Sequence, residues 1–111
     1  MNKKAQRRKR HRELLENSSL DQLKVIYCLG FFDTTVKDQF IIPEKENPYR
    51  QNYSLPKSTI EDYKWIKKHF KKLSVKVTAD EFKEIIRTAV PEIDEEFLNS
   101  VAKKLDSYYV L

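Results

Sequence analysis

The chain has 111 residues, enough for one domain with a modest hydrophobic core, and it carries 22 Lys and Arg against 17 Asp and Glu, a formal net charge of +5. Its single cysteine, Cys28, excludes an intramolecular disulfide and a zinc site built on thiolates. Its single glycine leaves little room for Gly-rich phosphate loops, tight hairpins or a β-sandwich, and therefore favours helices.

The basic charge is concentrated at the N-terminus. Residues 1–12 contain seven of the 22 basic side chains and none of the acidic ones. A segment so dense in charge has almost no apolar surface to bury, so we expect residues 1–16 to form a flexible arm, disordered by itself, ahead of a single helical domain at residues 17–111. The side chains expected to neutralise a polyanion are Lys3, Lys4, Arg7, Arg8, Lys9, Arg10 and Arg12.

The first helix of the domain is predicted from a capping box, in which Ser19 caps the helix and Gln22 reaches back. This helix is expected to run to Leu29, with Gly30 as its left-handed stop. Apolar residues on nearly every side mark it as the central helix, so Cys28 is expected to be a buried, inert thiol. The apolar run Leu23–Phe32 within this segment is too short to span a bilayer. We therefore expect no membrane association and a cytoplasmic protein, or a nuclear one in a eukaryote.

The segment after this helix is irregular. Phe40–Ile42 is a short apolar run that ends at Pro43 and is typical of a short strand. Residues 43–57 hold three of the four prolines and are expected to form a long loop. Loops of that length are commonly functional, and Tyr49 and Tyr53 would offer a contact surface there.

Three more helices are predicted from their ends. Ser58–Glu61 is a second capping box and begins a helix that continues to Leu73. Thr78–Glu81 is a third box, and its helix ends before Pro91. Acidic residues at 94–96 place negative charge at the positive end of the last helix. Apolar residues at helical spacing give these helices their core faces: Ile60, Tyr63, Ile66, Phe70 and Leu73; Phe82, Ile85, Ile86, Ala89 and Val90; Phe97, Val101, Leu105 and Tyr108.

These elements predict a mainly α, compact four-helix domain preceded by a disordered basic arm. A short two-stranded β element is expected where Val75–Thr78 pairs with Tyr108–Leu111. The tight turn at Val90–Asp94 suits a helix-turn-helix or winged-helix corner, although such a turn more commonly joins two core helices packed antiparallel.

A second basic region lies inside the domain, on the helix that ends at Leu73. Residues 57–76 carry seven lysines and two acids, whereas the regions on either side are acidic. Like charges four residues apart repel one another, and nothing within the helix offsets them. The side chains on this face that we expect to bind nucleic acid are Lys64, Trp65, Lys68, Lys71 and Lys72, with the only tryptophan placed to stack on a base. The alternative is a solvated lysine face on which Trp65 covers another element.

The sequence offers no arrangement typical of an enzyme. His11 and His69 lie far apart among basic residues, so neither a metal site nor a cofactor is expected. The acids of Glu92–Glu96 are better explained by a helix start than by paired catalytic carboxylates.

The combined pattern predicts a small, non-enzymatic nucleic-acid-binding protein, an intracellular accessory or regulatory factor, with DNA favoured over RNA. The arm and the lysine face would contact phosphates. The main alternative is a protein-interaction module, an adaptor or inhibitor that docks on an acidic protein partner. A ribosome- or RNA-associated factor is a third reading of the same charges.

Overall fold

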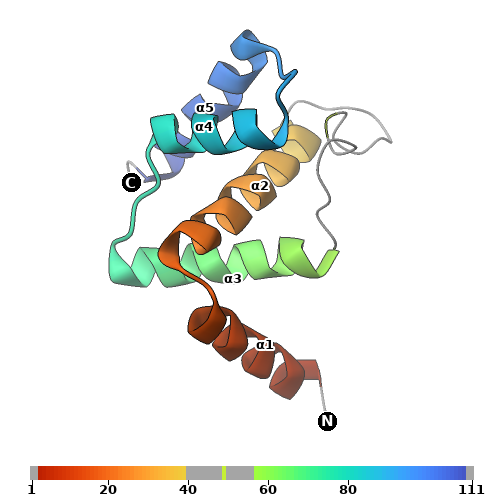
Figure 1. The fold of residues 1–111 in the computed structure, drawn as a ribbon, viewed down its shortest axis with the longest axis vertical. Helices are drawn as coiled ribbons and strands as arrows, with labels where there is room; N and C mark the ends of the chain where they lie inside the picture. The colour runs from red at the N-terminus through yellow and green to blue at the C-terminus, as the bar shows by residue number, and fades with distance from the viewer. Residues whose placement is uncertain (1–2, 40–48, 50–56, 110–111) are drawn as a thin grey trace.

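The computed structural model of this chain describes residues 3–39, 49 and 57–109, with side chains described for residues 3–36, 49 and 61–105. Within these ranges the chain forms helices and no strand (Figure 1). The helices are α1 (Lys3–Asn17), α2 (Leu20–Gln39), α3 (Lys57–Leu73), α4 (Ala79–Ala89) and α5 (Glu95–Tyr109). The mainly α class is confirmed.

Helix α2 runs through the centre of the fold and contacts α3, α4 and α5 (Figure 1). Its capping box is confirmed, because the Gln22 amide donates to Ser19 Oγ at 3.2 Å and the Ser19 amide donates to Gln22 Oε1 at 2.8 Å. The expected stop at Gly30 is wrong, since α2 continues for nine residues beyond it to Gln39.

Gly30 has a different role, at a close approach of two helices. Its φ is not positive. A Cβ built on Gly30 would lie 2.3 Å from the Tyr63 Cβ of α3, closer than carbon atoms can pack. The glycine therefore lets α2 and α3 come together instead of ending α2.

The core is built around aromatic residues of α2. Tyr27, Phe31 and Phe32 are buried, and the rings of Phe31 and Phe82 meet edge to face with centroids 5.7 Å apart. Cys28 is fully buried as expected. The other fully buried large side chains come from the remaining helices and the end of α2: Val36, Ile66, Phe70, Phe82, Ile86, Val90, Leu98, Val101 and Leu105.

The C-terminal end of α3 replaces the strand expected at Val75–Thr78. The Val75 amide donates to the Phe70 carbonyl at 2.9 Å and the Ser74 amide to the Lys71 carbonyl at 3.3 Å, which together make a Schellman motif. Ser74 takes the left-handed conformation of this motif, with φ of 56°. The Val75 amide, at the start of the expected strand, thus closes a helix instead. Leu73, which was expected in the core, is 61% exposed.

Helices α4 and α5 form a pair joined by a short turn. Thr78 caps α4, since the Glu81 amide donates to its hydroxyl at 3.1 Å, so this predicted box is confirmed. Asp94 caps α5 by accepting from the Phe97 amide at 2.9 Å. The strand expected at Tyr108–Leu111 is wrong for its first two residues, because α5 continues through Tyr109.

Several expectations lie outside the described residues. They include the short strand at 40–42, Tyr53, the side-chain contact of the Ser58 cap and nearly all of the 43–57 loop. Helix α3 begins at Lys57, the last residue assigned to that loop. Tyr49 is described and packs inward, with its ring centroid 5.4 Å from that of Phe97 and 6.2 Å from that of Phe32.

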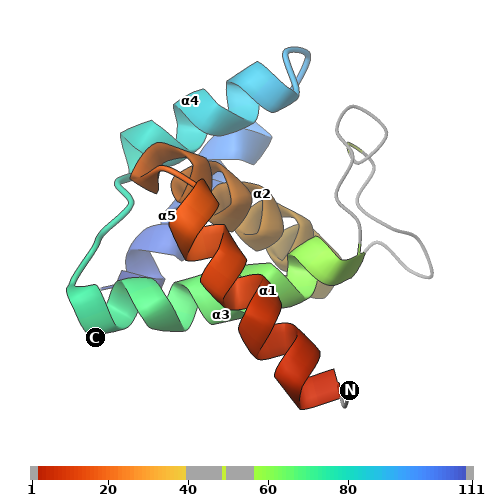
Figure 2. The same cartoon turned by 60° about the horizontal axis from the view of Figure 1, so that its bottom comes forward.

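The N-terminal segment corrects the expectation of a disordered arm and of four helices. Residues 3–17 form α1, which lies across α3 when the molecule is turned (Figure 2). The segment contains no glycine or proline and is rich in Lys, Arg, Gln and Glu, all good helix formers. Its charge prevents burial, and no α1 residue is buried, but charge alone does not prevent a helix. No helix in the described part of the chain is long and apolar enough to cross a membrane.

Candidate functional site

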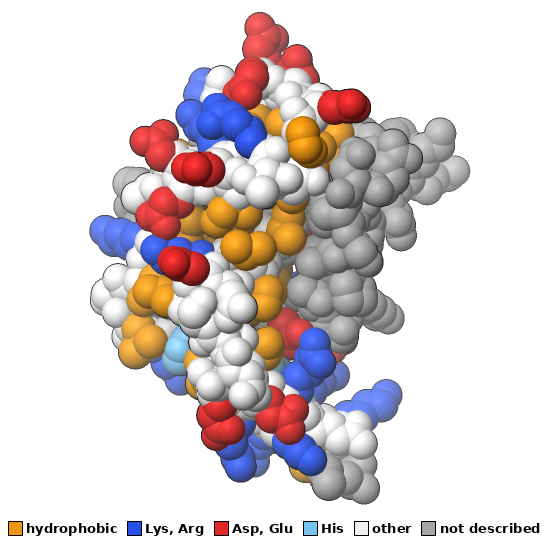
Figure 3. Space-filling model, viewed as in Figure 1, with side chains coloured by type: hydrophobic (Ala, Val, Ile, Leu, Met, Phe, Trp, Pro, Cys, Tyr) orange, Lys and Arg blue, Asp and Glu red, His pale blue; other side chains and the backbone are white. Residues whose placement is uncertain are grey.

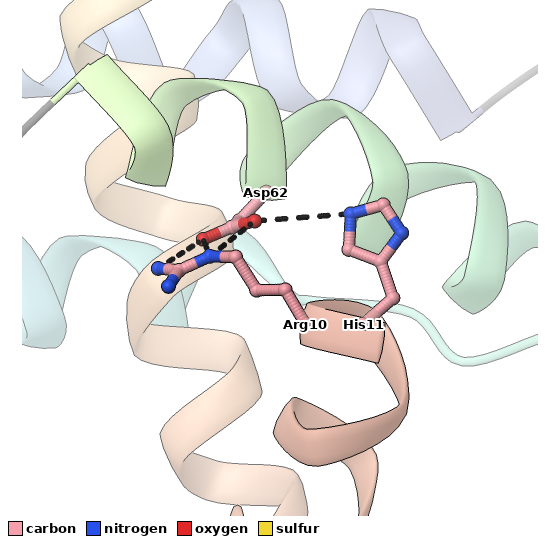
Figure 4. Close-up of polar contacts among 3 residues, drawn as sticks. All are labelled: Arg10, His11 and Asp62. Carbon is pink, nitrogen blue, oxygen red and sulfur yellow. Dashed lines mark hydrogen bonds and ion pairs between the residues drawn. The ribbon is translucent and has the colours of Figure 1, made fainter. Parts of the chain in front are cut away.

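Helix α1 is attached to α3 by one buried carboxylate (Figure 4). The Arg10 Nε donates to both Asp62 oxygens, at 3.2 and 3.0 Å, and its Nη2 donates to Oδ2 at 2.8 Å. The Asp62 side chain is 4% exposed, whereas that of Arg10 is 51% exposed. Asp62 raises the pKa of Arg10, chiefly through these hydrogen bonds. A buried carboxylate needs such a partner, because charge removed from water is otherwise strongly unfavourable.

A stack of three rings continues this contact along α3. His11 lies parallel to Trp65 with ring centroids 4.2 Å apart, and Trp65 lies parallel to His69 at 5.3 Å. His11 Nε2 also lies 3.8 Å from the nearer Asp62 oxygen. Burial lowers the pKa of His11, and the charges of Arg10 and Arg7 lower it further, while Asp62 opposes the shift. The surroundings of His11 therefore favour its neutral form.

Arg10 and His11, which make these contacts, share one face of α1 with two further residues. Arg7, Arg10, His11 and Leu14 follow the i, i+3, i+4, i+7 spacing, so their side chains point to the same side. His11 and Leu14 are half-buried, while the basic residues at 8, 9 and 12 are exposed. One charged helix thus presents a docking face with a small apolar end.

Between α1 and α3 lies a pocket of about 300 Å³, which we name the α1–α3 groove. Its lining combines four basic side chains with two carboxylates, a histidine and the tryptophan: Arg7, Arg10, His11, Glu61, Asp62, Lys64, Trp65 and Lys68. In Figure 3, Asp and Glu side chains gather over the turn between α4 and α5, whereas Lys and Arg side chains, with some acidic ones between them, surround α1 at the opposite end.

The groove brings together five of the twelve residues expected to bind nucleic acid: Arg7, Arg10, Lys64, Trp65 and Lys68. The rest of the basic α1 residues, Lys3, Lys4, Arg8, Lys9 and Arg12, are exposed on that helix away from the groove lining. Lys71 and Lys72 are exposed in the last turn of α3, where cations also favour the negative end of the helix dipole.

Three groove residues were missed by sequence reasoning: His11, Glu61 and Asp62. In the sequence pattern, the two acids only reduce the positive charge of residues 57–76. A usable signal was present, because Asp62 precedes Trp65 by three residues and Ile66 by four, on the same side of the helix. An acid on the stripe that carries the only tryptophan indicates a buried partner.

Outside the α1–α3 groove, the described residues give no evidence of a reactive thiol or of a metal site. Burial raises the pKa of the Cys28 thiol to about 12, so this cysteine is not a nucleophile. A search of the described side chains finds no group of three or more His, Cys, Asp and Glu placed to hold a metal ion. Comparison with models of protein families, with curated protein sequences and with solved structures finds no match to this chain.

Proposed function

We propose that this protein is a small, non-enzymatic nucleic-acid-binding protein that holds the phosphate backbone in the α1–α3 groove. The observation that carries the proposal is the convergence of Arg7, Arg10, Lys64 and Lys68 on one pocket from helices about 50 residues apart in the sequence. Cations collected from two helices onto one concave surface suit a ligand with several regularly spaced negative charges.

Duplex DNA is the first ligand we expect. Trp65 already stacks against His11 and His69, so its ring serves to pack α1 on α3. Single-strand binding relies on aromatic side chains that accept bases, whereas a duplex can be held through phosphates alone. We therefore assign Trp65 to the assembly of the groove and the lysines to the phosphates.

The corner between α4 and α5 is the place where a helix-turn-helix protein would present its recognition helix. In this chain the start of α5 carries Glu95 and Glu96, and the cap before it is Asp94. Arg87 is occupied there by two hydrogen bonds to Glu95 at 2.9 and 3.0 Å. An acidic helix start repels phosphate, so our proposal places the DNA on α1 and α3 and not at this corner.

The test is a titration of the protein with duplex DNA, single-stranded DNA and RNA of equal length. Contacts of Arg7, Lys64 and Lys68 with three phosphates give a log–log salt slope of about −2.7, or roughly a 40-fold loss of affinity between about 50 and about 200 mM salt. The double substitution Lys64→Glu and Lys68→Glu is expected to reduce the slope to about −0.9 and abolish most binding.

Lys71→Glu with Lys72→Glu is the matched control, because it reverses two charges on the same helix outside the groove lining. Equal losses from both pairs would contradict the groove as the site. Absence of binding to every nucleic acid at low salt, with capture of one acidic protein at a fixed stoichiometry, would replace the proposal by the protein-interaction alternative.

A further inference from the structure

The α1–α3 groove contains one buried carboxylate, Asp62, between two basic helices. Both helices that form it are strongly basic, so their approach is opposed by like-charge repulsion. No α1 residue is buried, so apolar burial contributes little to the contact. Besides the stacking of His11 on Trp65, the contact contains Asp62, which receives three hydrogen bonds from Arg10 and lies 3.8 Å from His11.

We propose that Asp62 is the positioning residue of the groove and that docking of α1 and binding of a polyanion are linked. Asp62 neutralises Arg10 inside the contact and holds α1 against α3, so the cations of both helices face one space. A bound polyanion neutralises the remaining cations and relieves the repulsion that opposes docking. The ligand half of this inference rests on the proposed function; the docking half does not.

Comparison with the neighbouring acid, Glu61, distinguishes the positioning role of Asp62 from a simple effect of its charge. Glu61 and Asp62 both line the groove and both carry one negative charge. Glu61 is exposed, whereas Asp62 is buried under Arg10. If only charge mattered, Glu61→Gln and Asp62→Asn would strengthen polyanion binding to a similar extent. If Asp62 assembles the groove, the two variants change affinity in opposite directions.

Docking is measured first, without ligand, because Trp65 is the only tryptophan and stacks on His11 of α1. Release of α1 exposes the indole, so Asp62→Asn is expected to shift the fluorescence emission maximum to longer wavelength and to remove amide hydrogen-exchange protection from residues 3–17. Glu61→Gln is expected to keep both signals of the natural chain. A cooperative unfolding transition in far-UV circular dichroism confirms that each variant remains folded.

Arg10→Gln is a second substitution expected to release α1 from α3. This substitution removes the half-exposed guanidinium that binds Asp62. Because Arg10 lies on a helix with no buried residue, we expect the rest of the domain to fold. Its emission maximum and exchange are expected to match those of Asp62→Asn. Protection of residues 3–17 unchanged in both variants would overturn the docking role of Asp62.

Binding is then measured with a duplex DNA oligonucleotide and, as a polyanion without bases, polyphosphate of defined length. Apparent affinity falls in proportion to the docked fraction, so a variant docked about one-tenth of the time binds about tenfold more weakly. We expect this loss for Asp62→Asn and a gain of a few-fold for Glu61→Gln. Saturating ligand is expected to return the emission of Asp62→Asn toward that of the natural chain, because linkage is reciprocal.

The failures are distinguishable. If Asp62→Asn releases α1 but binds both polyanions as tightly as Glu61→Gln, linkage is wrong and the proposed function stands. If the natural chain shows docked α1 but binds neither polyanion at low salt, the proposed function and the ligand half fail together, while the positioning role of Asp62 stands.

Discussion

Substitution of the only glycine should destabilise this protein, contrary to the usual effect in a helix. Gly30 lies inside α2, where glycine is normally less favourable than alanine by about 0.5–1 kcal/mol. A Cβ at this position would lie 2.3 Å from the Tyr63 Cβ and 2.6 Å from its Cγ. Because the nearest atom is attached directly to the α3 backbone, rotation of the tyrosine cannot relieve the contact.

The magnitude follows from the separation that α2 and α3 would need. Carbon atoms pack at about 3.5–4.0 Å, so the helices must move apart by more than about 1 Å along this seam. Tyr27 packs on Tyr63 and Phe70 across the same seam, with centroids 5.4 and 5.7 Å apart, and these contacts would loosen. Overpacking of this kind costs typically about 1–3 kcal/mol, so after the gain of about 0.5–1 kcal/mol in helix propensity we expect a net loss of up to about 2.5 kcal/mol.

The assay is urea unfolding followed by circular dichroism, with the thermal midpoint falling by roughly 4–8 °C for each kcal/mol lost. Lys104→Gly and Lys104→Ala, at an exposed position of α5, measure the propensity difference between glycine and alanine in this protein without a packing change. A Gly30→Ala variant more stable than the natural chain by that difference would refute the close approach of α2 and α3.

Three other expectations concern single residues. Ser74→Gly should raise the free energy of unfolding by about 0.5–1 kcal/mol in the same urea assay, because glycine adopts the left-handed C′ conformation without strain; no gain would contradict the Schellman end of α3. The Cys28 thiol, with its pKa raised to about 12, should react with a thiol reagent at pH 8 only as fast as the domain unfolds, so rapid reaction in native buffer would contradict its burial. The Lys24 hydrogen bond lowers the pKa of Glu81 below its ordinary 4.5, so the stability it contributes is full above about pH 4.5 and is lost as the pH falls through the native pKa; Glu81→Gln should flatten that acid loss in urea titrations.

The parts of the fold that sequence predicted well are those decided by local chemistry. The capping residues Ser19 and Thr78 each accept from an amide three residues away, so their pattern is visible in a short window. Although it fails for Leu73, helical periodicity predicts the buried residues of α3 and α4 in the same way: Tyr63, Ile66, Phe70, Phe82 and Ile86. These signals do not depend on where another helix lies.

The predictions that were wrong concern residues whose role depends on a distant part of the chain. Gly30 looks like a helix stop until Tyr63 is known to cross it, and Val75–Thr78 looks like a strand until the Val75 amide is known to close α3. The charge of α1 predicted disorder because its buried partner, Asp62, lies 52 residues from Arg10. Only the basic residues and Trp65 of the groove were predicted. A cluster of lysines and arginines stands out in a count of net charge, whereas Asp62 lowers that count and so is hidden by it.

His11 makes docking of α1 dependent on pH, and the direction is fixed by its surroundings. It faces Trp65 and Asp62 on α3, with Arg7 and Arg10 beside it on α1. Arg7 and Arg10 accompany His11 whether α1 is docked or released, so the difference comes from burial, which lowers the pKa below the ordinary 6.5, and from Asp62, which raises it by less. The released helix therefore binds a proton more readily than the docked helix, so docking is strongest above about pH 6.5 and weakens as the pH falls through the two pKa values.

The measurement is the position of the Trp65 emission maximum between pH 8 and pH 5, since position reports exposure of the indole and is less affected than intensity by quenching from a protonated imidazole. The natural chain is expected to shift to longer wavelength as the pH falls, whereas His11→Gln should show an emission position that does not change with pH. A shift of equal size in His11→Gln would assign the titration to another group. An emission position constant with pH in the natural chain would mean that the Arg10–Asp62 contact outweighs the proton, and α1 would then be held by that pair alone.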